Sequence, residues 1–236
     1  MKFIASTLAT ALSTLVLAGA AHAAIVETAD GQLSTAGWST GIGADASIYV
    51  PAAPTGSRGV ALSEGVWSTN TNIAFSAGQT LSAWVNPGPS PTDSNGAQGG
   101  RLYLGFNADA AGAYSFVAAS DTGALGFQDN SGYATPDFSA KTALSYADQW
   151  YRLSVTLSAD GSSATAQLFD ADGSTLLGST TETGLTRSAA TGIALRGTGG
   201  AAVASISVVP EPASAALMLL GLGALGLRAR RAGSAQ

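Results

Sequence analysis

Short stretches of alternating apolar and polar residues fill the middle of the chain. The clearest spans residues 150–157, where every second residue from 151 onward is large and apolar. An acidic-glycine pair at 160–161 then turns the chain, 163–169 runs back, and a second such pair at 172–173 precedes 174–177. Alternation of period two is typical of half-buried strands, and Asp-Gly pairs are typical of tight turns. The pattern predicts an antiparallel meander of three strands.

Further runs of the same kind occur along the chain, at 47–50, 81–85, 101–106, 113–117, 193–196 and 203–208. Strong helical periodicity is absent between them, and turn residues separate the short runs. This pattern predicts an all-β fold, an antiparallel two-sheet sandwich, as a single ectodomain over residues 24–208. Residues 29–60 are rich in Gly, Ala, Ser and Pro and define few strands beyond 47–50, so the role of residues 24–64 is left open.

The order of these runs resembles the concanavalin A-like, laminin-G-like jelly roll. In that family a tryptophan-led strand, here 150–157, is followed by a hairpin with an acidic-glycine turn, here 160–161. The resemblance covers residues 65–208, and it rests on the pattern of strands. It implies that the ectodomain is a jelly-roll sandwich.

The first 23 residues have the features of a secretory signal peptide. Lys2 precedes an apolar stretch rich in Leu and Ala, and Ala21-His22-Ala23 places small residues at the two positions that signal peptidase reads. We expect signal peptidase to cleave after Ala23. An uncleaved N-terminal anchor is the alternative.

The last 28 residues, 209–236, have three parts. A proline-rich mark is followed by an uncharged apolar run and a basic cluster: Val209, Pro210, Glu211 and Pro212, then 213–227, then Arg228, Arg230 and Arg231. As a helix the apolar run would be roughly 22 Å long, against a hydrocarbon core of ~30 Å. The arginines can snorkel to the interface and hold the C-terminus in the cytoplasm. We predict a single transmembrane helix over 213–227 and a basic tail over 228–236; a buried or fraying C-terminal helix is the alternative.

Together and in this order, the three parts resemble the PEP-CTERM sorting tag. Proteins with this tag are substrates of a bacterial membrane peptidase, exosortase, usually in Gram-negative species that make exopolysaccharide. The resemblance implies export through the inner membrane, transient anchoring there, cleavage near 210–212, and release or transfer to the cell surface or extracellular matrix. Residues 209–212 are then a recognition mark for another enzyme.

Composition excludes several kinds of chemistry. The chain has no cysteine, and its one histidine, His22, leaves with the signal peptide. Histidine acid–base catalysis, Ser-His-Asp and Cys-His nucleophiles and ordinary zinc sites are therefore excluded from the mature protein. Within residues 24–208 acidic residues outnumber basic ones by more than two to one. This charge argues against nucleic acid as a partner.

An enzyme is not expected. Glycoside hydrolysis needs two carboxyl groups that face one glycosidic bond. The hydrolases of the resembling family carry a Glu-x-Asp-x-Glu strand, and this sequence has no such run. A hydrolase with an unrecognised pair of carboxylates is the remaining alternative.

No cofactor is expected, and calcium alone is left open. Laminin-G-like and lectin sandwiches often bind calcium through Asp, Asn and backbone oxygens. The run Asp170-x-Asp172-Gly173 superficially resembles the start of a calcium loop, but the downstream glutamate is missing. A hairpin turn accounts for these residues, and no metal ligand is assigned.

Glycan binding would depend on aromatic residues that point away from the core. Strand alternation places three such rings there, those of Trp84, Tyr103 and Trp150. Aromatic faces can stack on sugar rings, and the neighbouring polar groups would be Asn107, Asp109 or Arg101. Alternatively, these rings pack under loops or under a covering segment such as 29–60.

We therefore expect an exported cell-envelope or extracellular protein that is not an enzyme. The expected role is that of a polysaccharide-associated or adhesive matrix component, with exopolysaccharide as its partner. A purely structural surface protein, whose outward aromatic residues only complete the packing, is the alternative.

Overall fold

The computed structural model describes residues 24–27, 32–33, 36–39, 42–45, 52–88, 100–187 and 191–210. The predicted signal peptide with Ala21 and Ala23 lies outside these residues. So do the predicted strand 47–50, Glu211, Pro212, the apolar run 213–227 and Arg228, Arg230 and Arg231. The part of the chain that is described contains no helix long and apolar enough to cross a membrane.

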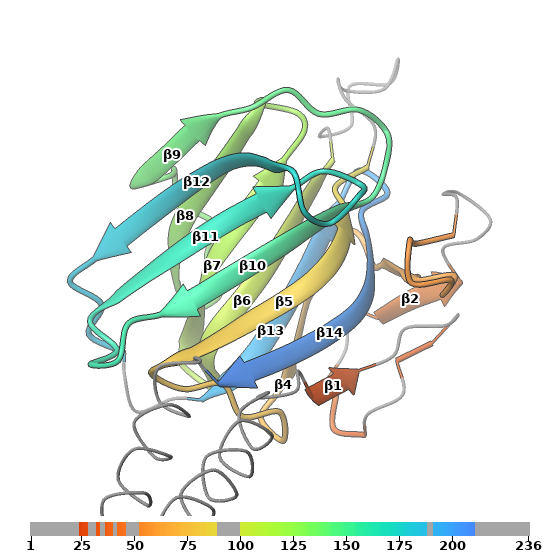
Figure 1. Cartoon of the computed structure of the whole chain (residues 1–236). Helices are drawn as coiled ribbons and strands as arrows, with labels where there is room; N and C mark the ends of the chain where they lie inside the picture. The colour runs from red at the N-terminus through yellow and green to blue at the C-terminus, as the bar shows by residue number, and fades with distance from the viewer. Residues whose placement is uncertain are drawn as a thin grey trace, which may run out of the picture. The chain divides into compact units, whose positions relative to one another are not determined.

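The described residues form two antiparallel sheets that face each other (Figure 1). The larger sheet has eight strands, in the order β12 (Leu176–Thr183), β11 (Ser163–Phe169), β10 (Tyr151–Leu157), β5 (Gln79–Asn86), β14 (Ala202–Pro210), β3 (Val60–Leu62) and β2 (Ile42–Asp45), with β1 (Ala24–Glu27) also paired to β14. The smaller sheet has six, in the order β4 (Trp67–Asn70), β13 (Gly192–Thr198), β6 (Arg101–Asp109), β7 (Gly112–Ala119), β8 (Ala124–Ser131) and β9 (Ala140–Ala143). The predicted all-β two-sheet sandwich is confirmed.

The predicted meander is present as β10, β11 and β12. Leu153 faces Leu168 across the first pair, and Ala166 faces Thr180 across the second. The third strand begins at Leu176 and not at 174, because the Asp172 carboxylate accepts hydrogen bonds from the backbone N–H groups of Ser174 and Thr175. These bonds hold the two residues in the turn.

The core lies between the sheets and is filled by alternate residues of the strands. Phe106 is at the centre of an aromatic group in the smaller sheet and is fully buried. Its ring centroid lies 6.1 Å from that of Phe75, 6.0 Å from Phe116 and 6.5 Å from Phe127. This inner face is mainly apolar, although Ser68 and Asn70 of β4 are also buried, opposite the core residues Leu195 and Ile193.

Candidate functional site

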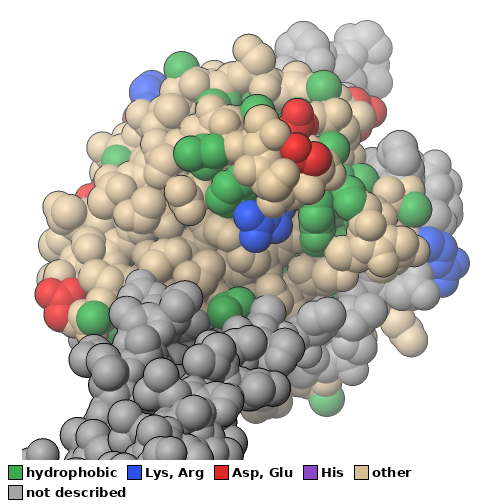
Figure 2. Space-filling view, in the orientation of Figure 1, with side chains coloured by type: hydrophobic (Ala, Val, Ile, Leu, Met, Phe, Trp, Pro, Cys, Tyr) green, Lys and Arg blue, Asp and Glu red, His purple; other side chains and the backbone are tan. Residues whose placement is uncertain are grey.

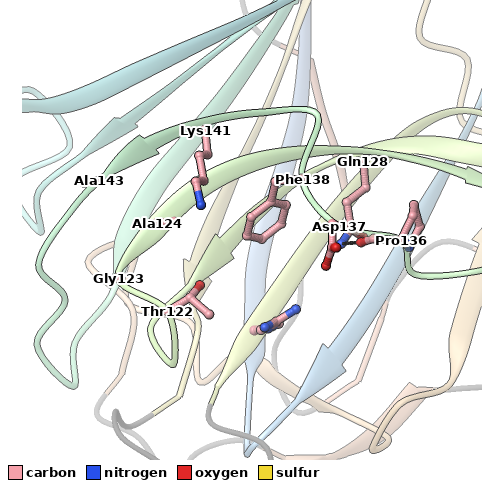
Figure 3. Close-up of a pocket in the computed structure, with 10 residues that line it drawn as sticks. Thr122, Gly123, Ala124, Gln128, Pro136, Asp137, Phe138, Lys141 and Ala143 are labelled. Atoms are coloured by element: carbon pink, nitrogen blue, oxygen red, sulfur yellow. Dashed lines mark hydrogen bonds between the residues drawn. The ribbon is translucent and has the colours of Figure 1, made fainter.

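The outer face of the smaller sheet carries a cavity of about 650 Å³ (Figure 3). Its walls come from the start of β6, the turn between β7 and β8, β8 itself, the loop that follows, and β9. The lining residues are Arg101, Thr122, Gly123, Ala124, Gln128, Pro136, Asp137, Phe138, Lys141 and Ala143. Their neighbours along the strands, such as Leu102 and Leu125, point into the core. Strand alternation thus separates the cavity from the core.

The ring of Phe138 lies directly over Gly126 of β8. A Cβ atom at Gly126 would lie 2.4 Å from two atoms of this ring, so only glycine leaves room for it. The guanidinium carbon of Arg101 is 5.7 Å from the centroid of the same ring. Phe138 remains partly exposed and presents an aromatic surface to the cavity.

The loop before β9 is tied to the sheet by a chain of buried amide side chains. The side-chain N–H of Gln128 donates to the carbonyl of Pro136, and Gln128 is itself 1% exposed. Asn130 Nδ2 donates to Gln128 Oε1 (3.0 Å) and to the carbonyl of Ala134 (2.7 Å). Buried polar groups with satisfied hydrogen bonds make a rigid arrangement. These hydrogen bonds therefore hold the cavity wall in place.

Charged groups of both signs reach the cavity. Arg101 Nε donates to Asp121 Oδ2 at 2.7 Å. Burial acts to lower the pKa of Arg101, but the hydrogen bond and ion pair with Asp121 outweigh it and raise the pKa above its usual value. Lys141 and Asp137 are exposed. In Figure 3 the Lys141 amine and the Asp137 carboxylate lie on either side of the Phe138 ring.

The aromatic residues proposed from the sequence are divided between the two sheets. Tyr103 is in the smaller sheet and is 1% exposed. The Trp67 ring packs against it edge-on at 5.5 Å between centroids, and the Arg196 guanidinium lies over it at 4.8 Å. Its ring points outward from the core as predicted from alternation, but other side chains cover it.

Trp150, which directly precedes β10 of the larger sheet, is also covered. It is 3% exposed and packs with Ala53. Gly59 has no side chain at the point of contact, since a Cβ atom there would lie 2.6 Å from Trp150 Cη2. The segment that precedes β3 therefore occupies the outer surface of this ring.

Trp84 is partly exposed on the outer face of the larger sheet. It lies opposite Arg152 of β10, and Gly173 of the turn between β11 and β12 packs against its ring. The guanidinium carbon of Arg152 is 4.2 Å from the centroid of Phe169. Figure 2 shows this face, on which charged side chains are few. Hydroxyl groups are paired across its strands, as in Thr80 with Thr156 at 2.8 Å.

Two of the three polar residues of the predicted glycan site, Asn107 and Asp109, lie away from the cavity. Asn107 is buried, with a positive φ of 48°, at an irregularity of β6. Asp109 Oδ1 accepts hydrogen bonds from the backbone N–H of Ala111 (2.8 Å) and from Arg187 Nη1 (3.2 Å). These bonds hold the turn between β6 and β7. Of the residues named from the sequence, Arg101 alone lines the cavity.

Sequence reasoning missed Phe138, Asp137, Lys141 and Gln128. Phe138 is an isolated aromatic residue in a polar stretch without alternation, so no strand pattern points to it. The one available indication is that Lys141, the only lysine between residues 24 and 208, lies three positions away.

The described residues include no group of three or more Asp, Glu, His or Cys side chains placed to hold a metal ion. The aspartates of the sequence 170–172 serve the hairpin: Asp170 Oδ1 accepts from Gln149 Nε2 at 2.7 Å, and Asp172 caps the turn. Calcium therefore has no assigned ligands in this part of the chain.

The C-terminal part of the chain is similar to a known protein family. Residues 208–232 match the family model described as the PEP-CTERM protein-sorting motif. The chain carries this sorting motif. The PEP-CTERM match includes Val209 and Pro210, which are the last two residues of β14. The folded ectodomain thus continues directly into a C-terminal signal for secretion and surface export.

Solved structures identify the fold. The Ca²⁺-bound exoplasmic/lumenal domain of VIP36 has a TM-score of 0.51 and 14% identity, and the match covers 75% of this chain and 84% of that one. The carbohydrate-binding module CBM66 from Bacillus subtilis has a TM-score of 0.47 and 14% identity, and the match covers 75% of this chain and 97% of that module. The Caenorhabditis elegans galectin LEC-6 has a TM-score of 0.43 and 17% identity, and the match covers 61% of this chain and 89% of the galectin. The ectodomain has the concanavalin A-like jelly-roll fold. No curated protein matches the sequence.

Proposed function

We propose that the ectodomain of this PEP-CTERM protein is a non-catalytic glycan-binding module, and that the cavity beside Phe138 is its binding site. The observation that carries the proposal is the partly exposed ring of Phe138, held over Gly126 inside a cavity of about 650 Å³. Small-molecule sites typically measure ~300–1,000 Å³ and combine apolar surface with a few placed polar groups. This cavity has both properties.

The chemistry of the lining suits a sugar. The apolar face of a sugar ring can stack on Phe138, while its hydroxyl groups meet donors and acceptors around that ring. Arg101 and Lys141 supply donors, and the Asp137 carboxylate supplies acceptors. Among the described lining residues Asp137 is the one carboxylate, whereas glycoside hydrolysis uses two. Binding without cleavage is the function that this set of groups supports.

The sorting motif supports a place for this module outside the cell. We propose that signal peptidase removes residues 1–23, that the chain stays in the inner membrane through 213–227, and that exosortase then acts near 210–212. The match over 208–232 supports the exosortase step. The mature product would be a polysaccharide-associated or adhesive component of the cell surface or matrix.

A structural role without a glycan ligand is the second candidate. The observation that favours it is the burial of Tyr103 and Trp150 under other parts of the protein. The two candidates differ in whether the free face of Phe138 has a ligand.

Binding of residues 24–208, which form one compact unit, to the host's exopolysaccharide tests the proposal, with calcium and with chelator in parallel. We expect saturable binding that Phe138→Ala weakens about tenfold or more, a loss of ~1.4 kcal/mol. Phe169→Ala is the matched control, because Phe169 is an outward, partly buried ring on the other sheet. Absence of binding, or equal losses in both variants, would favour the structural role.

A further inference from the structure

We infer that the cavity selects acidic glycans, with the Lys141 ammonium group as the receptor for the carboxylate of a uronic acid residue. This inference rests on the proposed function, because it assumes that the cavity binds a glycan. It adds the chemical class of the ligand and the orientation in which the sugar lies.

Lys141 differs from the other basic residues of the described part of the chain. Arg152 lies over Phe169, Arg187 pairs with Asp109, and Arg196 donates to the carbonyl of Gly65 at 3.1 Å. Arg101 is paired with Asp121, and Arg58 also has an interaction within the protein. Of these described cations, Arg152 and Lys141 make no hydrogen bond or ion pair; Arg152 lies over the ring of Phe169, whereas Lys141 is exposed. Its charge is available to a ligand.

The position of Lys141 is fixed relative to the aromatic ring. Lys141 of β9 lies directly opposite Gly126 of β8 in the strand register, and Gly126 is the residue beneath the ring of Phe138. A lysine at this position reaches the edge of any sugar stacked on that ring. Figure 3 shows the amine turned toward the cavity.

Asp137 determines the orientation in which an acidic sugar would bind in the cavity. Its carboxylate lies on the other side of the Phe138 ring from the amine of Lys141 (Figure 3). A uronate carboxylate placed near Asp137 would be repelled, whereas sugar hydroxyl groups can donate to it. The favoured orientation therefore has the sugar carboxylate at Lys141 and hydroxyl groups at Asp137.

The size of the preference for acidic sugars depends on how exposed the ion pair between Lys141 and the sugar carboxylate would be. Exposed ion pairs contribute modestly, so we expect about a three- to tenfold preference for an acidic sugar over its neutral counterpart at low salt. The whole chain has a formal net charge of −5, so its long-range field opposes a polyanion. A preference for the acid must then come from the cavity itself.

The test compares acidic polymers with their own neutral derivatives. The full-length chain, purified in detergent, is titrated with polygalacturonate and alginate and with the same polymers after reduction of their carboxyl groups to hydroxymethyl groups. We expect the native acidic polymers to bind about three- to tenfold more tightly. Lys141→Gln should abolish this preference and keep binding of the neutral polymers, and Lys141→Arg should retain the preference.

Two further variants separate the inference from the function on which it rests. Asp137→Asn should increase the preference for the acid, because it removes the repelling charge. Phe138→Ala should weaken binding of acidic and neutral polymers alike. Equal affinity of the wild-type chain for both forms overturns the acidic selectivity and leaves the glycan-binding function standing. Binding to none of the four polymers overturns the selectivity for uronic acids, and binding to the host's exopolysaccharide then decides whether the glycan-binding function stands.

Discussion

Replacing Gly126 by alanine tests directly whether Phe138 lies where the structure places it. The new Cβ atom would be 2.4 Å from Cγ and Cδ1 of the ring and 2.7 Å from Cδ2. Ordinary contacts of such an atom begin at 3.4 Å, so the ring has to move by about 1 Å or more. Gly126 is not among the glycines with positive φ, so its backbone tolerates alanine. Any effect of the substitution therefore arises from the ring.

Two opposing contributions determine how much Gly126→Ala changes the free energy of unfolding. Overpacking typically costs ~1–3 kcal/mol, but Phe138 is partly exposed and can swing outward, so the cost should lie at the lower end. Alanine is favoured over glycine within a strand by ~0.5–1 kcal/mol. We expect Gly126→Ala to lower the free energy of unfolding by at most about 1 kcal/mol. In a chain that already carries Phe138→Ala, the same substitution should be neutral or stabilising.

Urea unfolding of residues 24–208, followed by tryptophan fluorescence, gives all four corners of this double-mutant cycle. A coupling of about 1 kcal/mol between the two positions is the expected result. Gly126→Ala should also weaken glycan binding, because it displaces the stacking surface. If the cost of Gly126→Ala is the same in both backgrounds to within ~0.3 kcal/mol, the ring does not rest on Gly126 and the reasoning is refuted.

Three further outcomes are expected. Phe106→Ala should cost about 3–5 kcal/mol in urea unfolding, because Phe106 is fully buried among other rings, and a loss below ~2 kcal/mol would contradict that packing. Gly59→Ala should lower the thermal midpoint, since φ is +70° there and the new Cβ would meet Trp150 at 2.6 Å; an unchanged midpoint would argue against this contact. Hydrogen bonds from the Ser158 hydroxyl, and from the backbone and hydroxyl of Ser162, lower the pKa of Asp160 to about 2. The stability that these bonds contribute is present above the unfolded pKa of ~3.9 and is lost as the pH falls through about 2. Asp160→Asn should therefore make the urea midpoint depend less on pH between these two values. If the wild type and the variant show the same pH profile, the bonds to Asp160 do not contribute in this way.

The strands could be predicted where the sequence has a local period. In β10 each second residue is apolar, and the following Asp-Gly turns set the meander, so the pattern was sufficient. The short strand β9 has residues of no clear alternation and could not be found in this way. The sorting motif was readable because its parts follow one another along the chain. Each of these features is contained within a continuous stretch of residues.

Whether an outward aromatic ring is accessible depends on contacts between distant residues. Alternation correctly turns Tyr103 and Trp150 away from the core, but whether an outward ring is free depends on what covers it. For Tyr103 the cover is Trp67 and Arg196, and for Trp150 it is the segment around Gly59, far away in the sequence. No local period carries that information.

The sequence by itself determined the sandwich, its main strands and the C-terminal sorting motif, because periodicity and contiguous motifs are local properties of a chain. Only the tertiary structure decided that Phe138, and not the predicted aromatic residues, presents a ring to a cavity. That outcome depends on pairing β8 with β9, which brings Gly126 beneath the ring and Lys141 beside it. Sheet register creates such neighbours from residues that no sequence pattern connects.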